Sequence, residues 1–158
     1  MLRKIDLEMS KAVRNRVPFF KDNTEVKVSK YKAATVYLFG NIIARVVGNW
    51  IVLSKECVEK EKWKTATTKR RINALLHEFV PCLGLYQFKG TWLFSRNRRI
   101  LEVGHTLFWE TDNVSINVNE EFISINYIRY PLYDEPSKEI AWKQNKLSRK
   151  LNPRKLYF

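Results

Sequence analysis

The sequence of 158 residues contains only two cysteines, two histidines and five glycines, and each scarcity excludes a kind of site. Cys57 and Cys82 lie far from each other and from any Cys/His spacing that binds zinc, so we expect two reduced thiols. His77 and His105 occur in no metal-binding or nucleophile motif, and no glycine-rich phosphate loop is present. These absences predict a protein that is not an enzyme and needs no cofactor.

Long apolar runs are also missing from the chain. No segment approaches the roughly 20 residues that cross a membrane, and the N-terminus lacks the uninterrupted apolar core of a signal peptide. We therefore expect a soluble intracellular protein with no membrane partner. Apolar residues still make up 45% of the chain, which is enough for the core of one domain.

Acidic residues are scarce except in one block. The formal net charge is +13, yet residues 101 to 136 hold seven acids against one Arg. Lys and Arg outnumber acids by nine to four in residues 1 to 32, twelve to four in 33 to 100, and seven to one in 137 to 158. Such an excess favours a polyanionic partner, chiefly DNA or RNA, although an anionic membrane or an acidic protein is compatible with composition alone.

Periodicity predicts an α+β fold. An apolar stripe predicts an amphipathic helix over residues 2 to 16, which packs on its own sheet or docks on a partner. Residues 25 to 103 read as short β-rich runs around one further helix, with Gly40-Asn41 and Gly48-Asn49 supplying hairpin turns. The predicted architecture is a mostly antiparallel twisted sheet with one helix packed across it. The first stripe consists of Leu2, Ile5, Met9, Ala12 and Val13.

The expected domain covers residues 1 to 136. Alternating apolar residues predict an acidic hairpin within residues 106 to 130, which extends the first sheet or forms a second one. This hairpin could mask the basic surface, mimic nucleic acid or mediate assembly between copies. Residues 137 to 158 have an incomplete apolar stripe and are predicted to form a basic, partly helical arm.

The helix predicted within residues 63 to 79 carries the first candidate site. Ile72, Leu75, Leu76 and Phe79 share one face and predict burial, whereas Arg70 and His77 should lie on the outer face beside Asn73. Threonines and cations at a helix start can form a phosphate site, although a solvated helix end paired with nearby acids is the alternative. The candidate phosphate-binding residues are Lys64, Thr65, Thr67, Thr68, Lys69, Arg70 and Arg71.

A second basic cluster follows two aromatic residues. Arg96, Arg98 and Arg99 lie at a predicted strand turn, where they could neutralise phosphates. Trp92 and Phe94 precede them, and they either stack on bases or are buried in the core.

The remaining carboxylates give no clear metal site. Five acids lie in predicted turns, where a solvated edge is expected rather than a divalent cation, so we predict no metal. These acids are Asp112, Glu120, Glu121, Asp134 and Glu135.

Four spaced segments match a shared pattern, NTxV, LHGNxIA, WxTxTTKxRLNALL and GxW. They are residues 23–26, 38–44, 63–76 and 90–92, with Phe39 in place of His and Ile72 in place of Leu. The pattern resembles a family of small uncharacterised proteins of tailed bacteriophages. The resemblance implies phage origin, in the host cytoplasm or the virion, without implying an activity.

These observations together predict a non-enzymatic phage accessory protein that binds nucleic acid mainly through phosphate contacts. The alternative is a virion component, or a factor that binds a host macromolecule through a protein interface.

Overall fold

The computed structural model describes residues 2–54, 65–96, 106–109 and 114–132. Some predicted features lie outside these residues. They are Lys64, Arg98, Arg99, Cys57, His105, the acids Asp112, Asp134 and Glu135, and the arm over residues 137 to 158.

Helix α1 (Lys4–Asn15) confirms the predicted N-terminal helix. It ends at Arg16, which adopts a left-handed conformation with φ of 54°, and Pro18 follows. Its buried face differs from the expected apolar stripe, because Asp6 and Ser10 are buried beside Met9 and Val13. A carboxylate can occupy that face only because another element supplies an opposite charge.

Helix α3 (Ala66–Phe79) is the second helix among the described residues. Thr65 caps its start, and the Thr65 hydroxyl accepts a hydrogen bond from the Thr68 backbone N–H at 3.1 Å. Ile72, Leu75 and Leu76 are fully buried, as their spacing predicts. Phe79 is partly buried, and the guanidinium of Arg14 lies 5.0 Å from its ring centre.

The larger sheet has eight strands, and every neighbouring pair is antiparallel. On its inner face, one row of cross-strand partners is entirely buried and apolar. The row consists of Val36, Ala44, Leu53 and Val114. In sheet order the strands are β1 (Phe19–Lys21), β2 (Thr24–Val28), β3 (Ala34–Leu38), β4 (Asn41–Val47), β5 (Trp50–Leu53), β9 (Val114–Asn117), β10 (Phe122–Ile125) and β11 (Ile128–Pro131).

A separate sheet of three strands contains β6 (Leu83–Phe88), β7 (Thr91–Arg96) and β8 (Thr106–Trp109). Trp92 and Phe94 are fully buried, with ring centres 5.5 and 5.6 Å from that of Trp109. One hydrophobic cluster includes side chains from both sheets and both helices. The described residues therefore share a single core.

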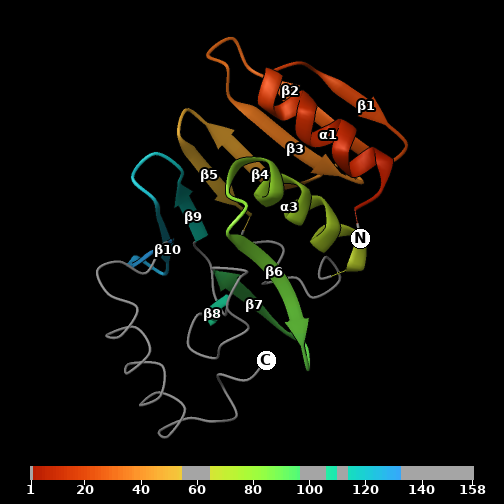
Figure 1. Cartoon of the computed structure of the whole chain (residues 1–158). Helices are drawn as coiled ribbons and strands as arrows, with labels where there is room; N and C mark the ends of the chain where they lie inside the picture. The colour runs from red at the N-terminus through yellow and green to blue at the C-terminus, as the bar shows by residue number, and fades with distance from the viewer. Residues whose placement is uncertain (1, 55–64, 97–105, 110–113, 133–158) are drawn as a thin grey trace, which may run out of the picture.

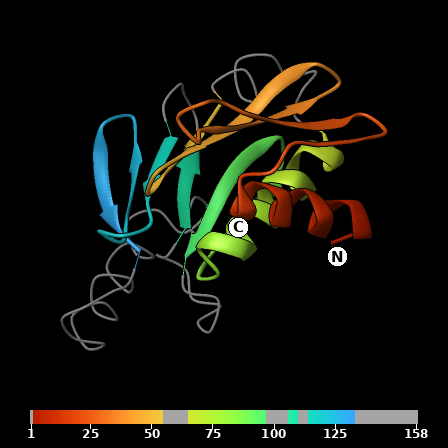
Figure 2. The same cartoon turned by 90° about the horizontal axis from the view of Figure 1, so that it is seen from above.

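The two helices lie side by side on the same face of the eight-stranded sheet (Figures 1 and 2). The opposite face of that sheet carries alternating exposed residues, for example Arg45, Val47 and Val52. Within the described part, neither helix has the length and apolar character that crossing a membrane requires.

The α+β fold with a mostly antiparallel sheet is confirmed. The acidic segment extends the first sheet, because β9 pairs with β5. The range 106 to 130 is nevertheless divided between the sheets, since β8 pairs with β7. Strands β1 and β11 are short edge strands that hydrophobic alternation did not predict.

The β3–β4 hairpin turns through Phe39 and Gly40, one residue earlier than the predicted Gly-Asn pair. Phe39 has φ of 51° and Gly40 has φ of 77°, as a type I′ turn requires. A residue with a Cβ is disfavoured in this left-handed region, and Asn tolerates it better than Phe. The Phe39 ring is 64% exposed, so burial offsets little of this strain.

Phe39→Asn should therefore raise the free energy of unfolding by about 0.5–1 kcal/mol, because Asn-Gly is the favoured type I′ pair. Chemical denaturation with an unchanged m-value would measure the gain. Phe39→Ala is the control, since it removes the exposed ring without favouring the left-handed conformation. A lower unfolding midpoint for Phe39→Asn would show that the ring stabilises the fold.

Candidate functional site

A groove lies along the outer face of α3, where this helix meets β6. It has a volume of about 560 Å³ and is bordered on the helix by Lys69, Arg70, Asn73 and His77. A step of 100° per residue places these four side chains within one arc of the helix. Arg70, Asn73 and His77 share one side of α3, as predicted, and Lys69 lies beside them. The opposite wall and the end consist of Leu2, Leu83, Gly84, Leu85, Tyr86 and Ser95.

Asn73 fixes the two walls of the groove to each other. Its Nδ2 donates to the Leu85 carbonyl at 2.8 Å, and its Oδ1 accepts from the Leu85 N–H at 2.7 Å. Since β6 is an edge strand of the three-stranded sheet, this amide satisfies backbone groups that have no neighbouring strand on that side. The groove therefore has a defined width at its centre.

The groove is basic. Among the described residues, no acid borders it, and neither Lys69 nor Arg70 forms an ion pair. Arg70 Nη2 donates to the Thr67 hydroxyl at 3.2 Å, whereas Arg70 Nε is shielded from solvent and has no described acceptor. An anion bound by the Arg70 guanidinium would form charge-assisted hydrogen bonds, which are stronger than neutral ones.

The threonines at the helix start, which were predicted to bind phosphate, form hydrogen bonds within α3. Thr65 and Thr68 are bonded to each other, through the Thr68 N–H and through the two hydroxyls at 3.1 Å. Thr68 is fully buried, and Thr67 accepts from Arg70. Lys69 and Arg70, the two residues that follow Thr68, are the cations of this segment that border the groove.

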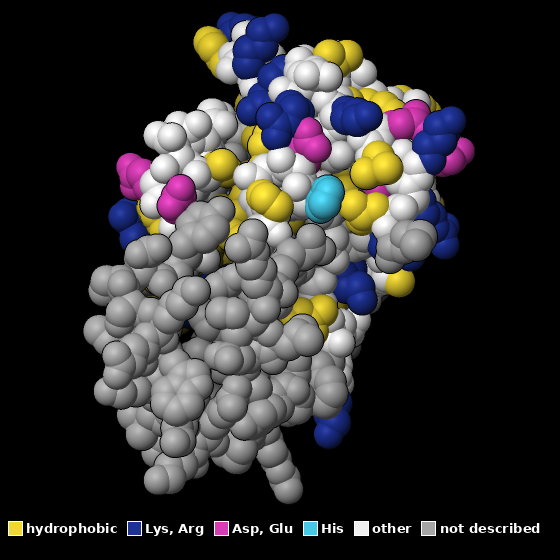
Figure 3. All heavy atoms as spheres, viewed as in Figure 1, with side chains coloured by type: hydrophobic (Ala, Val, Ile, Leu, Met, Phe, Trp, Pro, Cys, Tyr) yellow, Lys and Arg dark blue, Asp and Glu magenta, His cyan; other side chains and the backbone are white. Residues whose placement is uncertain are grey.

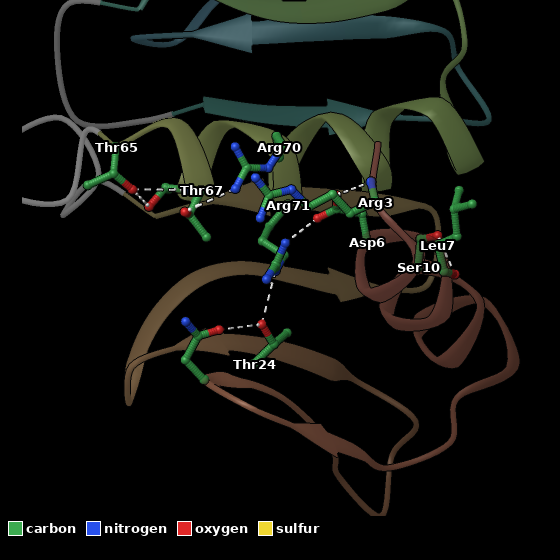
Figure 4. Close-up of polar contacts among 11 residues, drawn as sticks. Arg3, Asp6, Leu7, Ser10, Thr24, Thr65, Thr67, Arg70 and Arg71 are labelled. Atoms are coloured by element: carbon green, nitrogen blue, oxygen red, sulfur yellow. Dashed lines mark hydrogen bonds and ion pairs between the residues drawn. The ribbon is translucent and has the colours of Figure 1, made fainter. Parts of the chain in front are cut away.

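Arg71 points away from the groove and into the core (Figure 4). It is 4% exposed, pairs through Nη1 with the fully buried carboxylate of Asp6, and donates from Nε to the Thr24 hydroxyl at 2.9 Å. The same carboxylate accepts from the Arg3 backbone N–H at the start of α1. Arg71 was predicted to contact phosphate, but this buried pair removes it from the accessible cations.

The second predicted cluster is only partly described. Arg96 Nη1 donates to the Pro131 carbonyl at 2.8 Å, so this side chain links β7 to β11. Trp92 and Phe94 are fully buried and cannot stack on bases. Burial, the alternative considered for these aromatics, is confirmed.

Sequence patterns did not predict the β6 side of the groove. Tyr86 and Ser95 lie 13 and 22 residues after Asn73 and come from neighbouring strands. Nothing in their local pattern distinguishes them from other polar strand residues. Only the pairing of Asn73 with Leu85 brings them beside α3.

The molecular surface around the helices is predominantly basic. On the face shown in Figure 3, Lys and Arg side chains extend over the upper part of the molecule, with fewer Asp and Glu side chains among them. Among the described residues, no group of three or more His, Cys, Asp and Glu side chains is placed to hold a metal ion.

A family model described as Kyanoviridae Gp96 protein matches residues 2–126. This match includes every residue of the groove and both helices. Searches of curated proteins and of solved structures found no match.

Arg71→Met should lower the free energy of unfolding by about 3–5 kcal/mol, because it leaves the Asp6 carboxylate buried without its counter-charge. Asp6→Leu combined with Arg71→Met should recover most of this loss, since neither buried charge then remains. Urea denaturation of the three proteins would measure both effects.

Arg14→Met is the matched control for this pair. Arg14 and Glu78 form an ion pair whose side chains are 52% and 24% exposed, so its loss should cost at most about 1 kcal/mol. Equal destabilisation by Arg14→Met and Arg71→Met would contradict the special role of the buried pair.

Proposed function

Because the chain belongs to the Kyanoviridae Gp96 protein family, a family of phage proteins, we propose that it is a non-enzymatic accessory protein that binds DNA or RNA mainly through phosphate contacts. The groove between α3 and β6 is the proposed contact surface. Lys69 and Arg70 are its cationic residues, and they replace the longer list of candidates expected from the helix start.

The observation that supports this proposal is a groove that is bordered by cations and, among the described residues, by no acid. Lys69 and Arg70 lie on successive positions of α3 and are both partly exposed. Lys supplies a compact charge with three donors, and Arg supplies a planar fork that matches phosphate oxygens. Tyr86 and Ser95 add hydroxyl groups of the kind that often contact phosphate or sugar.

Binding through this groove would be largely independent of base sequence. Phosphate contacts set the position and orientation of a nucleic acid, whereas base-edge contacts give specificity. Asn73 could recognise adenine in another setting, but here both ends of its amide are occupied by Leu85. The chemistry of the groove therefore favours backbone recognition.

The exposure and hydrogen bonding of His77, the histidine that borders the groove, support a non-enzymatic role. His77 is exposed and forms no hydrogen bond with another described residue. General acid–base catalysis by an imidazole usually requires a group that orients it. We propose that His77 contributes polarity to the groove wall rather than proton transfer.

An interaction protein is the second candidate, either in the virion or bound to a host macromolecule. It is favoured by large apolar side chains in turns and on an edge strand, where Phe20 is 74% and Tyr31 81% exposed. Mass spectrometry of purified virions would test the virion role. Capture from infected cells with nuclease treatment would separate a retained protein partner from one held by nucleic acid.

Lys69→Glu combined with Arg70→Glu should lower nucleic-acid affinity by roughly 10- to 100-fold at low salt, because it reverses both cations of the groove. The neutral pair Lys69→Gln and Arg70→Gln should reduce the slope of log affinity against log salt by about 0.9 for each duplex phosphate that is no longer neutralised. Fluorescence anisotropy with a labelled duplex over a salt series would measure both.

Lys11→Glu combined with Lys30→Glu is the matched control for net charge. Both lysines are exposed and neither borders the groove, so this variant should retain most of the affinity. A similar loss in both double variants would indicate a general charge effect and exclude the groove as the binding site. A flat salt response of the unmodified protein would exclude phosphate binding altogether.

A further inference from the structure

The outer face of the eight-stranded sheet carries a row of side chains that crosses seven strands, and all of them except Val52 are polar or basic. Antiparallel register places Lys27, Thr35, Arg45, Val52, Ser115, Ser124 and Arg129 side by side. Neighbouring strands lie about 4.8 Å apart, so the row is about 29 Å long. Lys27, Arg45 and Arg129 are exposed, and the side chains between them are mostly short.

Aromatic side chains border this row on both sides. Tyr37 lies two residues beyond Thr35 on β3, and Trp50 lies two residues before Val52 on β5. Strands β3 and β5 run in the same direction, so the two rings lie on opposite sides of the row. Trp50 is 37% exposed despite its edge contact with Phe122, at 5.5 Å between ring centres.

Contacts within the face hold its cations near the aromatic rings. The Lys27 ammonium lies 4.9 Å from the Tyr37 ring centre, and the Arg129 guanidinium lies 4.5 Å from that of Phe122. Arg45 Nε donates to the Thr35 hydroxyl at 3.3 Å. These contacts limit the rotamers of three long side chains and so reduce the entropy lost when a ligand binds.

We propose that this face binds single-stranded nucleic acid, with the sugar-phosphate backbone along the row and bases on Trp50 and Tyr37. Alternating cations and aromatic rings on an open sheet suit a single strand, whose unpaired bases can stack on side chains. Bases inside a duplex are already stacked and cannot reach the rings. The ligand is again a nucleic acid, as in the proposed function, but this face contains no residue of the groove.

Charge argues against a second copy of the chain as the occupant of this face. Glu25 is the only acid among the described strand residues that point to this side. Two copies packed face to face would bring Lys27, Arg45 and Arg129 against a like-charged surface, which is unfavourable. A polyanion provides the complementary charge.

The test compares a labelled oligothymidine of 15 nucleotides with a duplex of the same length by fluorescence anisotropy. Trp50→Ala and Tyr37→Ala should each weaken single-strand binding by roughly 5- to 150-fold, the range expected when one base–aromatic stack is removed. Duplex affinity should change less than about twofold, since stacking does not contribute to it. Trp50→Phe should restore most of the single-strand affinity.

Three further variants test whether a loss of single-strand binding reflects misfolding, the removal of any exposed aromatic ring, or the groove. Arg45→Glu lies on the exposed row and leaves the core untouched, so it should weaken single-strand binding even if Trp50→Ala is unstable. Tyr31→Ala is the aromatic control, because Tyr31 is 81% exposed in the turn after β2 and also has a lysine over its ring. Lys69→Glu with Arg70→Glu reports on the groove alone.

Each outcome decides the proposal. Selective loss of single-strand binding in the Trp50, Tyr37 and Arg45 variants supports it, even if the groove variant binds normally and the proposed groove function fails. Unchanged single-strand binding in these variants overturns the proposal. The proposed groove function still stands in that case if the Lys69 and Arg70 variant binds more weakly. Equal weakening of single-strand and duplex binding, or a fall in oligomer mass with Trp50→Ala, would also overturn it.

Discussion

The buried ion pair between Asp6 and Arg71 determines how the two helices lie on the sheet. Asp6 is fully buried and Arg71 is 4% exposed, and desolvating two charges costs several kcal/mol per ion unless their geometry is complete. Here the carboxylate also bonds the Arg3 N–H, and the guanidinium also bonds Thr24 on β2. One polar node therefore links the start of α1, the middle of α3 and the second strand. Any rotation of α3 about its axis would break it.

The buried pair also fixes the position of the groove, because it sets the orientation of α3 about its axis. With Arg71 directed into the core, a step of 100° per residue turns Arg70, Asn73 and His77 away from it, by about 100° to 160° around the axis of α3. Asn73 then binds the backbone of β6 and closes one side of the groove. Much of the segment that resembles the phage family is consequently structural. Thr65 and Thr68 cap α3, and Arg71 forms the buried pair. Lys69 is the polar pattern residue that borders the groove without a fixed partner among the described residues.

Local patterns predicted what depends on local geometry. Hydrophobic spacing identified both helices and most strands, and the 100° step identified Arg70, Asn73 and His77 as neighbours on the outer face. It could not identify Asp6 as the partner of Arg71, because the two residues are 65 positions apart and no local rule links them. The division of the acidic segment between two sheets depends in the same way on long-range pairing, of β5 with β9 and of β7 with β8. Propensity carries no information about such partners.

The number of layers around each strand determines which aromatics reach solvent. Basic residues beside Trp92 and Phe94 suggested a surface for stacking bases, but β7 is covered on both faces, and Trp92, Leu93 and Phe94 are all fully buried. Strand β5 is covered by the core on one face only. Its residues therefore alternate between exposed and buried, with Trp50 and Val52 outward and Ile51 and Leu53 inward. The same combination of aromatic and basic side chains is thus available on the outer face of the larger sheet, since no helix among the described residues packs there.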